Sequence, residues 1–185
     1  MKFILDTNVC RDMMFLRELA PLSERHRHQV VISVLVVAER AAQLRRERAA
    51  TFQENRIRDS FRTFQFEVVP ISEDDAFKLA LKLSSWYPDA AAWTRAKLEQ
   101  QHRALRLSSV LEVKSSHTYP ATLDWYLAAH AAWLGADAER AVAYGALPDA
   151  GPDAVLVTED QGLEFSHVWR VDKMHALKLA EETIP

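Results

Sequence analysis

Short apolar runs alternate along this chain with stretches in which apolar residues recur at helical spacing. The runs are rich in β-branched and aromatic residues and predict strands at residues 3–5, 29–33, 66–71, 154–157 and 168–171. The periodic stretches predict helices at residues 9–20, 34–44, 73–86, 122–135 and 173–182. Strands that alternate with helices predict an α/β sandwich around a mostly parallel sheet.

Capping and breaking residues indicate where several of these helices begin and end. Pro21 is expected to end the first helix, because proline cannot donate the hydrogen bond that would continue it. Ser33 is expected to cap the second helix. Three acids, residues 73–75, stand in the first turn of the third helix, where the helix dipole favours them. Gly135 is expected to close the strongly apolar fourth helix.

Residues 84–120 break the alternation of strands and helices. The pattern there predicts an inserted helical element followed by a loop, and Trp86, Tyr87 and Trp93 are expected to pack this insert onto the body. The 185 residues, 49% of them hydrophobic, suffice for one well-buried core but not for two large domains. We therefore expect a single domain over residues 1–185 with a helical insert at 84–120.

Composition narrows the classes of function. The net charge of −3 argues against broad coating of a polyanion, although it is compatible with a local basic surface. The 4 glycines form no dinucleotide-binding or phosphate-loop pattern, so nucleotide cofactors are not expected. The one cysteine, Cys10, predicts a small core residue in a reducing cytoplasm. No apolar segment approaches the roughly 20 residues of a membrane helix, and no signal-peptide pattern is present.

Polar side chains follow two of the predicted strands. Asp6 comes directly after the first strand, and Thr158, Glu159 and Asp160 follow the fourth. In an open parallel sheet, ligands bind beyond the carboxyl ends of the strands, so these residues are candidates for a site. The alternative for Asp6 is that it only caps the helix that begins near Val9.

Two further acids interrupt apolar helices. Glu39 stands among valines and alanines in the second helix, and Asp124 lies in the first turn of the fourth. The structural alternatives are an exposed Glu39 beside Arg40 and an Asp124 that only complements the helix dipole. His130 is not expected to bind a metal, because no second His or Cys lies at metal-ligand spacing from it.

Four carboxylates that meet at one edge of a sheet require a compensating cation. Two like charges about 4 Å apart repel by about 4 kcal/mol at an effective dielectric constant near 20. Oxygen ligands alone favour a hard metal, Mg²⁺ or Mn²⁺, over zinc. Such a site suits hydrolysis of a phosphodiester, because the metal activates water and neutralises charge on the phosphate.

Four segments of the chain each contain one of these acids. They are FILDTNV at residues 3–9, SVLVVAE at 33–39, DWYLAAHAA at 124–132 and LVTED at 156–160. Together they resemble the four signature segments of the PIN-domain family, and the likeness spans nearly the whole chain. Many members of that family are VapC-type ribonuclease toxins of bacterial toxin–antitoxin pairs.

The resemblance implies a three-layer α/β/α fold and an endonuclease that depends on Mg²⁺ or Mn²⁺. The matching positions are Asp6, Glu39, Asp124 and Asp160 for the family's catalytic, metal-binding acids, and Asn8 and Thr158 for its supporting polar residues. Single-stranded RNA is the substrate we expect. The expected partners are an antitoxin protein and a second copy of the chain in a homodimer.

Several alternatives stay open at the level of sequence. Glu159 competes with Asp160 for the place of the fourth acid, and residues 84–120 and 136–153 are longer than the matching parts of compact toxins. One alternative function is an inactive PIN-like module that binds RNA or docks a partner. The other is a phosphatase of the haloacid-dehalogenase type, but that class requires Asp-x-Asp where this chain has Asp6 and Asn8.

Overall fold

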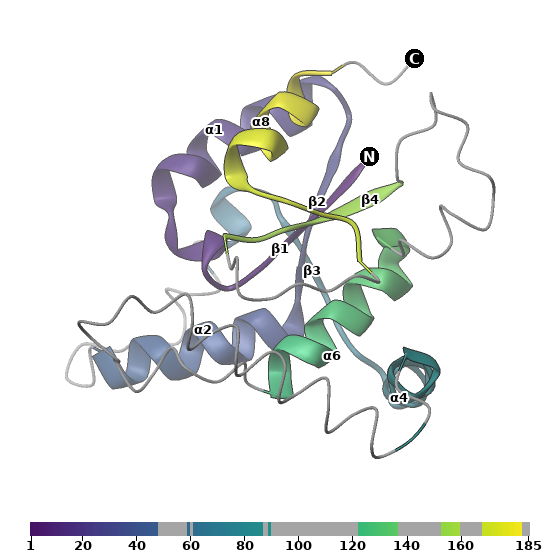
Figure 1. The fold of residues 1–185 in the computed structure, drawn as a ribbon. Helices are drawn as coiled ribbons and strands as arrows, with labels where there is room; N and C mark the ends of the chain where they lie inside the picture. The colour runs from purple at the N-terminus through teal and green to yellow at the C-terminus, as the bar shows by residue number, and fades with distance from the viewer. Residues whose placement is uncertain are drawn as a thin grey trace, which may run out of the picture.

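A parallel sheet forms the centre of the molecule (Figure 1). The computed structural model describes residues 1–47, 59, 61–86, 89, 122–136, 153–159 and 168–182, without the side chains of 46, 47 and 122–125. Within these ranges the strands are β1 (Lys2–Leu5), β2 (Gln29–Ser33), β3 (Glu67–Val69), β4 (Ala154–Val157) and β5 (Arg170–Val171). They pair in parallel in the order β3-β2-β1-β4-β5, which confirms the predicted α/β class.

Helices cover both faces of this sheet. They are α1 (Met13–Arg25), α2 (Val34–Glu47), α4 (Glu73–Trp86), α6 (Thr122–Ala131) and α8 (Lys173–Glu181), with the short helical turns η1 (Val9–Arg11) and η2 (Ala132–Ala136). Helices α1 and α8 pack together on one face, and α6 packs against α2 and α4 on the other (Figure 1). The layers are those of the predicted three-layer sandwich. No helix within the described ranges combines the length and the apolar character needed to cross a membrane.

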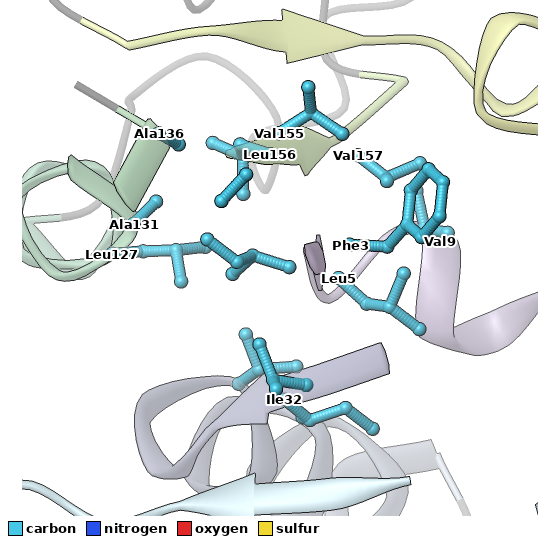
Figure 2. Close-up of a cluster of buried hydrophobic side chains, with 14 of the residues drawn as sticks. Phe3, Leu5, Val9, Ile32, Leu127, Ala131, Ala136, Val155, Leu156 and Val157 are labelled. Carbon is cyan, nitrogen blue, oxygen red and sulfur yellow. The ribbon is translucent and has the colours of Figure 1, made fainter. Parts of the chain in front are cut away.

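The central strands are apolar because both of their faces are covered. Phe3, Ile4 and Leu5 of β1 are fully buried, as expected of a parallel strand between two helical layers. Figure 2 shows side chains of β1, β2 and β4 in one cluster, with Leu127 and Ala131 of α6 on one side and Val9 on the other. Burial of this cluster, at about 25 cal/mol per Å² of apolar surface, is the main source of the sheet's stability.

The order of the strands determines where a site can form. From β1 the chain proceeds outward through β2 to β3, and it then returns to the other side of β1 to form β4 and β5. Leu5 pairs with Ile32 of β2 and with Val157 of β4, so these three strands end at the same level. The point where the strand order reverses, between β1 and β4, is where open α/β sheets form their ligand crevice.

The predicted limits of the first helix were wrong. Residues 9–11 form a separate turn, and α1 begins at Met13 because Asp12 is extended and its Oδ1 accepts hydrogen bonds from the Met14 and Phe15 amides, both at 3.1 Å. Pro21 lies inside α1 and does not end it. A proline removes one backbone donor, and the buried face formed by Phe15, Leu16, Leu19 and Ser23 extends past it.

The other helix boundaries follow the predicted signals. The Ser33 hydroxyl accepts a hydrogen bond from the Leu35 amide at the start of α2, and Gly135 has a φ of 117°, a conformation that favours glycine, at the end of η2. Of the predicted insert at 84–120, the structure describes residues 84–86, which are the last residues of α4, and residue 89. The remainder of the insert lies outside the described residues.

His130 is buried beneath the end of β2. Its Nδ1 is 2.8 Å from the Ser33 hydroxyl, and its Nε2 has no hydrogen-bond partner within the described part of the chain. The ring stacks on Trp133. Burial lowers the pKa of His130, an effect opposed only in part by the charge of Asp75, so the neutral imidazole is the folded form near pH 7.

This burial makes the stability of the protein depend on pH. Below the ordinary histidine pKa of about 6.5, the unfolded chain takes up a proton that folded His130 does not. The free energy of unfolding therefore decreases as the pH decreases. The free energy of unfolding of wild type relative to that of His130→Leu should therefore decrease from pH 7.5 to pH 5, by at most about 1.4 kcal/mol per pH unit. Urea unfolding at a series of pH values measures it. A difference that stays constant with pH would contradict a neutral buried His130.

Candidate active site

Asp6 is a buried carboxylate held by donors from both sides of the reversal point. It follows β1 and is 6% exposed. Its Oδ1 accepts a hydrogen bond from the Thr7 amide at 2.6 Å. Its Oδ2 accepts from Asn8 Nδ2 at 2.8 Å and from the Thr158 hydroxyl at 2.6 Å. These bonds fix the plane of the carboxylate, since donors reach both of its oxygens.

Asn8 and Thr158 join the ends of β1 and β4. The Asn8 side-chain amide donates to the Thr158 hydroxyl at 3.2 Å, and its carbonyl oxygen accepts from the Glu159 amide at 3.2 Å. The Asp6 amide donates to the Val157 carbonyl at 3.0 Å. The structure thus brings together Asp6, Asn8 and Thr158, which the sequence had grouped as one acid and two supporting residues.

Glu39 reaches the same site through Thr7. The Thr7 hydroxyl donates a hydrogen bond to Glu39 Oε2 at 2.5 Å. On the other side, Gln43 Nε2 donates to Glu39 Oε1 at 3.1 Å. Glu39 is half-buried, which excludes the alternative of a fully exposed residue. Two carboxylates from different elements, Asp6 and Glu39, therefore share one neighbour, Thr7.

The other two predicted acids cannot be placed to the same depth. Asp124 lies in the first turn of α6, but its side chain is outside the described residues. Asp160 also lies outside them. Among the described residues, no group of three or more His, Cys, Asp or Glu side chains is arranged to hold a metal ion.

Glu159 points toward α8, where it has a structural contact. Its Oε1 accepts a hydrogen bond from the Lys173 amide at 2.9 Å, at the first residue of that helix. A carboxylate there satisfies a donor that has no partner within the helix and faces the positive end of the helix dipole. The two candidates for the fourth acid are Glu159 and Asp160. The contact with α8 gives the Glu159 carboxylate a structural role, so its charge needs no metal to explain it.

An ion pair beside this contact connects α1 to α8. Lys173 Nζ is 2.7 Å from Asp12 Oδ2. The hydrogen bond from Lys173, followed by that from the Phe15 amide, lowers the pKa of Asp12, and the same ion pair raises the pKa of Lys173. The Glu159 charge also raises the pKa of Lys173. The positive charge of Lys173 is thus held by acids at the start of the two helices.

Cys10 contributes no reactive group to the site. It is buried, and burial, with a smaller contribution from the Asp6 charge, raises the pKa of its thiol well above the ordinary range, although Arg40 opposes the shift. The thiol therefore remains protonated at neutral pH and is neither a nucleophile nor a ligand for a soft metal. The atoms around Asp6 and Glu39 that could bind a metal are carboxylate and hydroxyl oxygens, and oxygen ligands fit Mg²⁺ or Mn²⁺.

Sequence reasoning missed Thr7 and Gln43. Thr7 stands between the two residues of the Asp-x-Asn pattern, and its contact with Glu39 spans 32 positions of the chain, so no local signal identifies it. Gln43 does have a signal, since it follows Glu39 by four residues, the spacing at which two helical side chains meet.

Two solved structures are similar to this chain. One is VapBC2 from Rickettsia felis, bound to a DNA fragment from its promoter, with 17% identity, a TM-score of 0.47, and coverage of 93% of this chain and 98% of that one. The other is VapBC-1 from nontypeable Haemophilus influenzae, with 17% identity, a TM-score of 0.44, and coverage of 94% and 99%. No protein-family model matches the chain, and no curated protein sequence matches it.

The contacts of Thr158 give a testable estimate of how strongly the site joins β1 to β4. Thr158→Val keeps the shape of this buried side chain but removes its hydroxyl bonds to Asp6 and Asn8, so it should lower the free energy of unfolding by about 1–3 kcal/mol. Thr158→Ser keeps the hydroxyl and serves as the control. Chemical unfolding in EDTA measures both. Equal stability of the Val and Ser variants would show that these bonds do not hold the strands together.

Proposed function

We propose that this chain is a metal-dependent endoribonuclease of the PIN type that hydrolyses phosphodiester bonds of single-stranded RNA. The observation that carries the proposal is the meeting of Asp6 and Glu39 across Thr7 at the reversal point of a parallel sheet. Two carboxylates in one partly buried site repel each other, and a divalent cation is the partner that removes this repulsion. The sequence resemblance supports the same assignment.

Asp6, Glu39, Asp124 and Asp160 are the residues that would hold Mg²⁺ or Mn²⁺. When bound, the metal supplies Lewis-acid chemistry, which activates water and neutralises charge on the phosphate. Within the chain, Asn8, Thr158 and the Thr7 amide orient the Asp6 carboxylate, and the Thr7 hydroxyl and Gln43 orient Glu39. Fixed carboxylates raise the rate because the site needs little reorganisation when charge develops on the phosphate.

The contacts of Asn8 oppose the phosphatase alternative. A phosphatase of that type requires Asp-x-Asp after its first strand, and Asn8 stands at the second of these two positions. Asn8 instead donates to Asp6 and Thr158 and accepts from the Glu159 amide, so its side chain is engaged in holding the site. The inactive binding module has the same fold and the same acids, and a cleavage assay separates it from the nuclease.

Cleavage of a mixed pool of single-stranded RNA, with Mg²⁺, Mn²⁺ or EDTA, tests the proposal. Wild type should cut only with metal, and Asp6→Asn or Asp160→Asn should lose roughly 100-fold or more in rate. Glu159→Gln is the matched control, because glutamine still accepts the hydrogen bond from Lys173, and it should cut like wild type.

Two results would contradict the nuclease. One is a wild type that cuts neither RNA nor DNA with either metal. The other is an Asp6→Asn variant as active as wild type. Wild type that binds RNA without cutting it would favour the binding module.

The proposed biological role is that of a toxin held by an antitoxin in the cytoplasm.

The proposed oligomeric state is a homodimer. Large apolar side chains that a second copy could cover are exposed on α1 and α4, among them Met14, Phe77 and Leu81. Light scattering at micromolar concentration should give twice the 21.1 kDa mass of the chain. A mass near 21.1 kDa would contradict the homodimer without affecting the proposed chemistry.

A further inference from the structure

We infer that Thr7 is a positioning residue that sets Glu39 against Asp6, with Gln43 holding Glu39 from the opposite side, and that the site needs the Thr7 hydroxyl to bind a divalent cation tightly. The inference rests on the proposed function, since it concerns the same site. It assigns to Thr7 a role that neither Asp6 nor Glu39 can fill.

Thr7 contacts both carboxylates with two different groups. Its backbone amide donates to Asp6 Oδ1 at 2.6 Å, and its hydroxyl donates to Glu39 Oε2 at 2.5 Å. Thr7 is 4% exposed, so water has little access to replace the hydroxyl if it is removed. The two bonds can be separated by mutation, because a side-chain substitution leaves the bond from the amide to Asp6 in place.

Glu39 needs this support more than Asp6 does. Asp6 is a short side chain next to the strand end and receives bonds on both oxygens from Thr7, Asn8 and Thr158. Glu39 has a longer side chain, is half-buried, and reaches the site from α2. Without the hydroxyl, the carboxylate is free to rotate away from Asp6, since like charges repel and the longer side chain has more rotamers.

Gln43 fixes the second oxygen of Glu39 less firmly. Its amide donates to Oε1 at 3.1 Å, and Gln43 Oε1 in turn accepts from Arg40 Nη1 at 3.4 Å. Gln43 is only half-buried, whereas Thr7 is buried, so water can take the place of the Gln43 amide more easily than that of the Thr7 hydroxyl. The effect of losing Gln43 should therefore have the same direction as that of losing Thr7 but a smaller size.

Residues that orient a metal ligand typically change metal affinity by 10–100-fold when they are removed. Thr7→Val has nearly the shape of threonine and lacks only the hydroxyl, so it should raise the Kd for Mn²⁺ by about 10–100-fold. Thr7→Ser loses the methyl group and keeps the hydroxyl, so it should bind Mn²⁺ within about threefold of wild type. A role in packing alone would give the opposite order, with Ser affected more than Val.

The experiment is a Mn²⁺ titration of the full chain by calorimetry, for wild type, Thr7→Val, Thr7→Ser and Gln43→Met, with unfolding curves in EDTA to show that each variant is folded. Gln43→Met changes a half-buried position and keeps the test available if Thr7→Val folds poorly. The expected order of affinity is wild type and Ser, then Gln43→Met, then Val.

Two outcomes overturn the inference while the proposed metal site stands. In the first, Thr7→Val and Gln43→Met bind Mn²⁺ like wild type. In the second, Thr7→Ser loses as much affinity for Mn²⁺ as Thr7→Val. A wild type that binds no Mn²⁺ overturns the metal site and the inference together. A wild type that binds Mn²⁺ in the expected order but cuts no RNA supports the inference and contradicts the nuclease.

Discussion

The parallel pairing of β1 with β2 on one side and β4 on the other is the constraint on which the site depends. Leu5 is level with both Ile32 and Val157, so the residues that follow β1 and β4 come out at one edge although 150 positions separate Asn8 from Thr158. The strands themselves are apolar and buried on both faces. Polar chemistry can therefore gather only beyond their ends.

The hydrogen bonds at that edge serve the fold and the chemistry together. Asp6 accepts donors from its own loop and from the end of β4, so its carboxylate both joins two strands and presents a fixed negative charge. Thr7 extends the arrangement to α2 through Glu39. By contrast, the charges of Asp12, Glu159 and Lys173 are paired with one another or with the start of a helix, and they stabilise the packing of α8 against α1.

The parts of this arrangement that the sequence predicted are those with local signals. Buried strands appear in the sequence as short apolar runs, and Asp6 and Thr158 stand where two of those runs end. Both the sheet and the first acid could therefore be predicted. The limits of α1 could not, because the capping bonds of Asp12 begin the helix later and the buried face outlasts Pro21. His130 was not expected to be a ligand, and what the sequence did not show is that it binds Ser33 across 97 positions.

Thr7 marks the limit of sequence reasoning most clearly. A threonine between Asp6 and Asn8 has no periodicity or spacing that distinguishes it. Its proposed role depends on α2, a helix that begins 27 residues later and places Glu39 within hydrogen-bond distance of the Thr7 hydroxyl. The positions of Asp124 and Asp160 in the site stay predictions, since their side chains are not among those described.

Asp6 and Glu39 are proposed to belong to one divalent-cation site. The most direct measurement is a crystal structure of the protein soaked in Mn²⁺, with the metal located by its anomalous scattering. We expect a peak that carboxylate oxygens of both Asp6 and Glu39 contact directly. Crystals that take up Mn²⁺ elsewhere, with no peak in contact with either carboxylate, would contradict it.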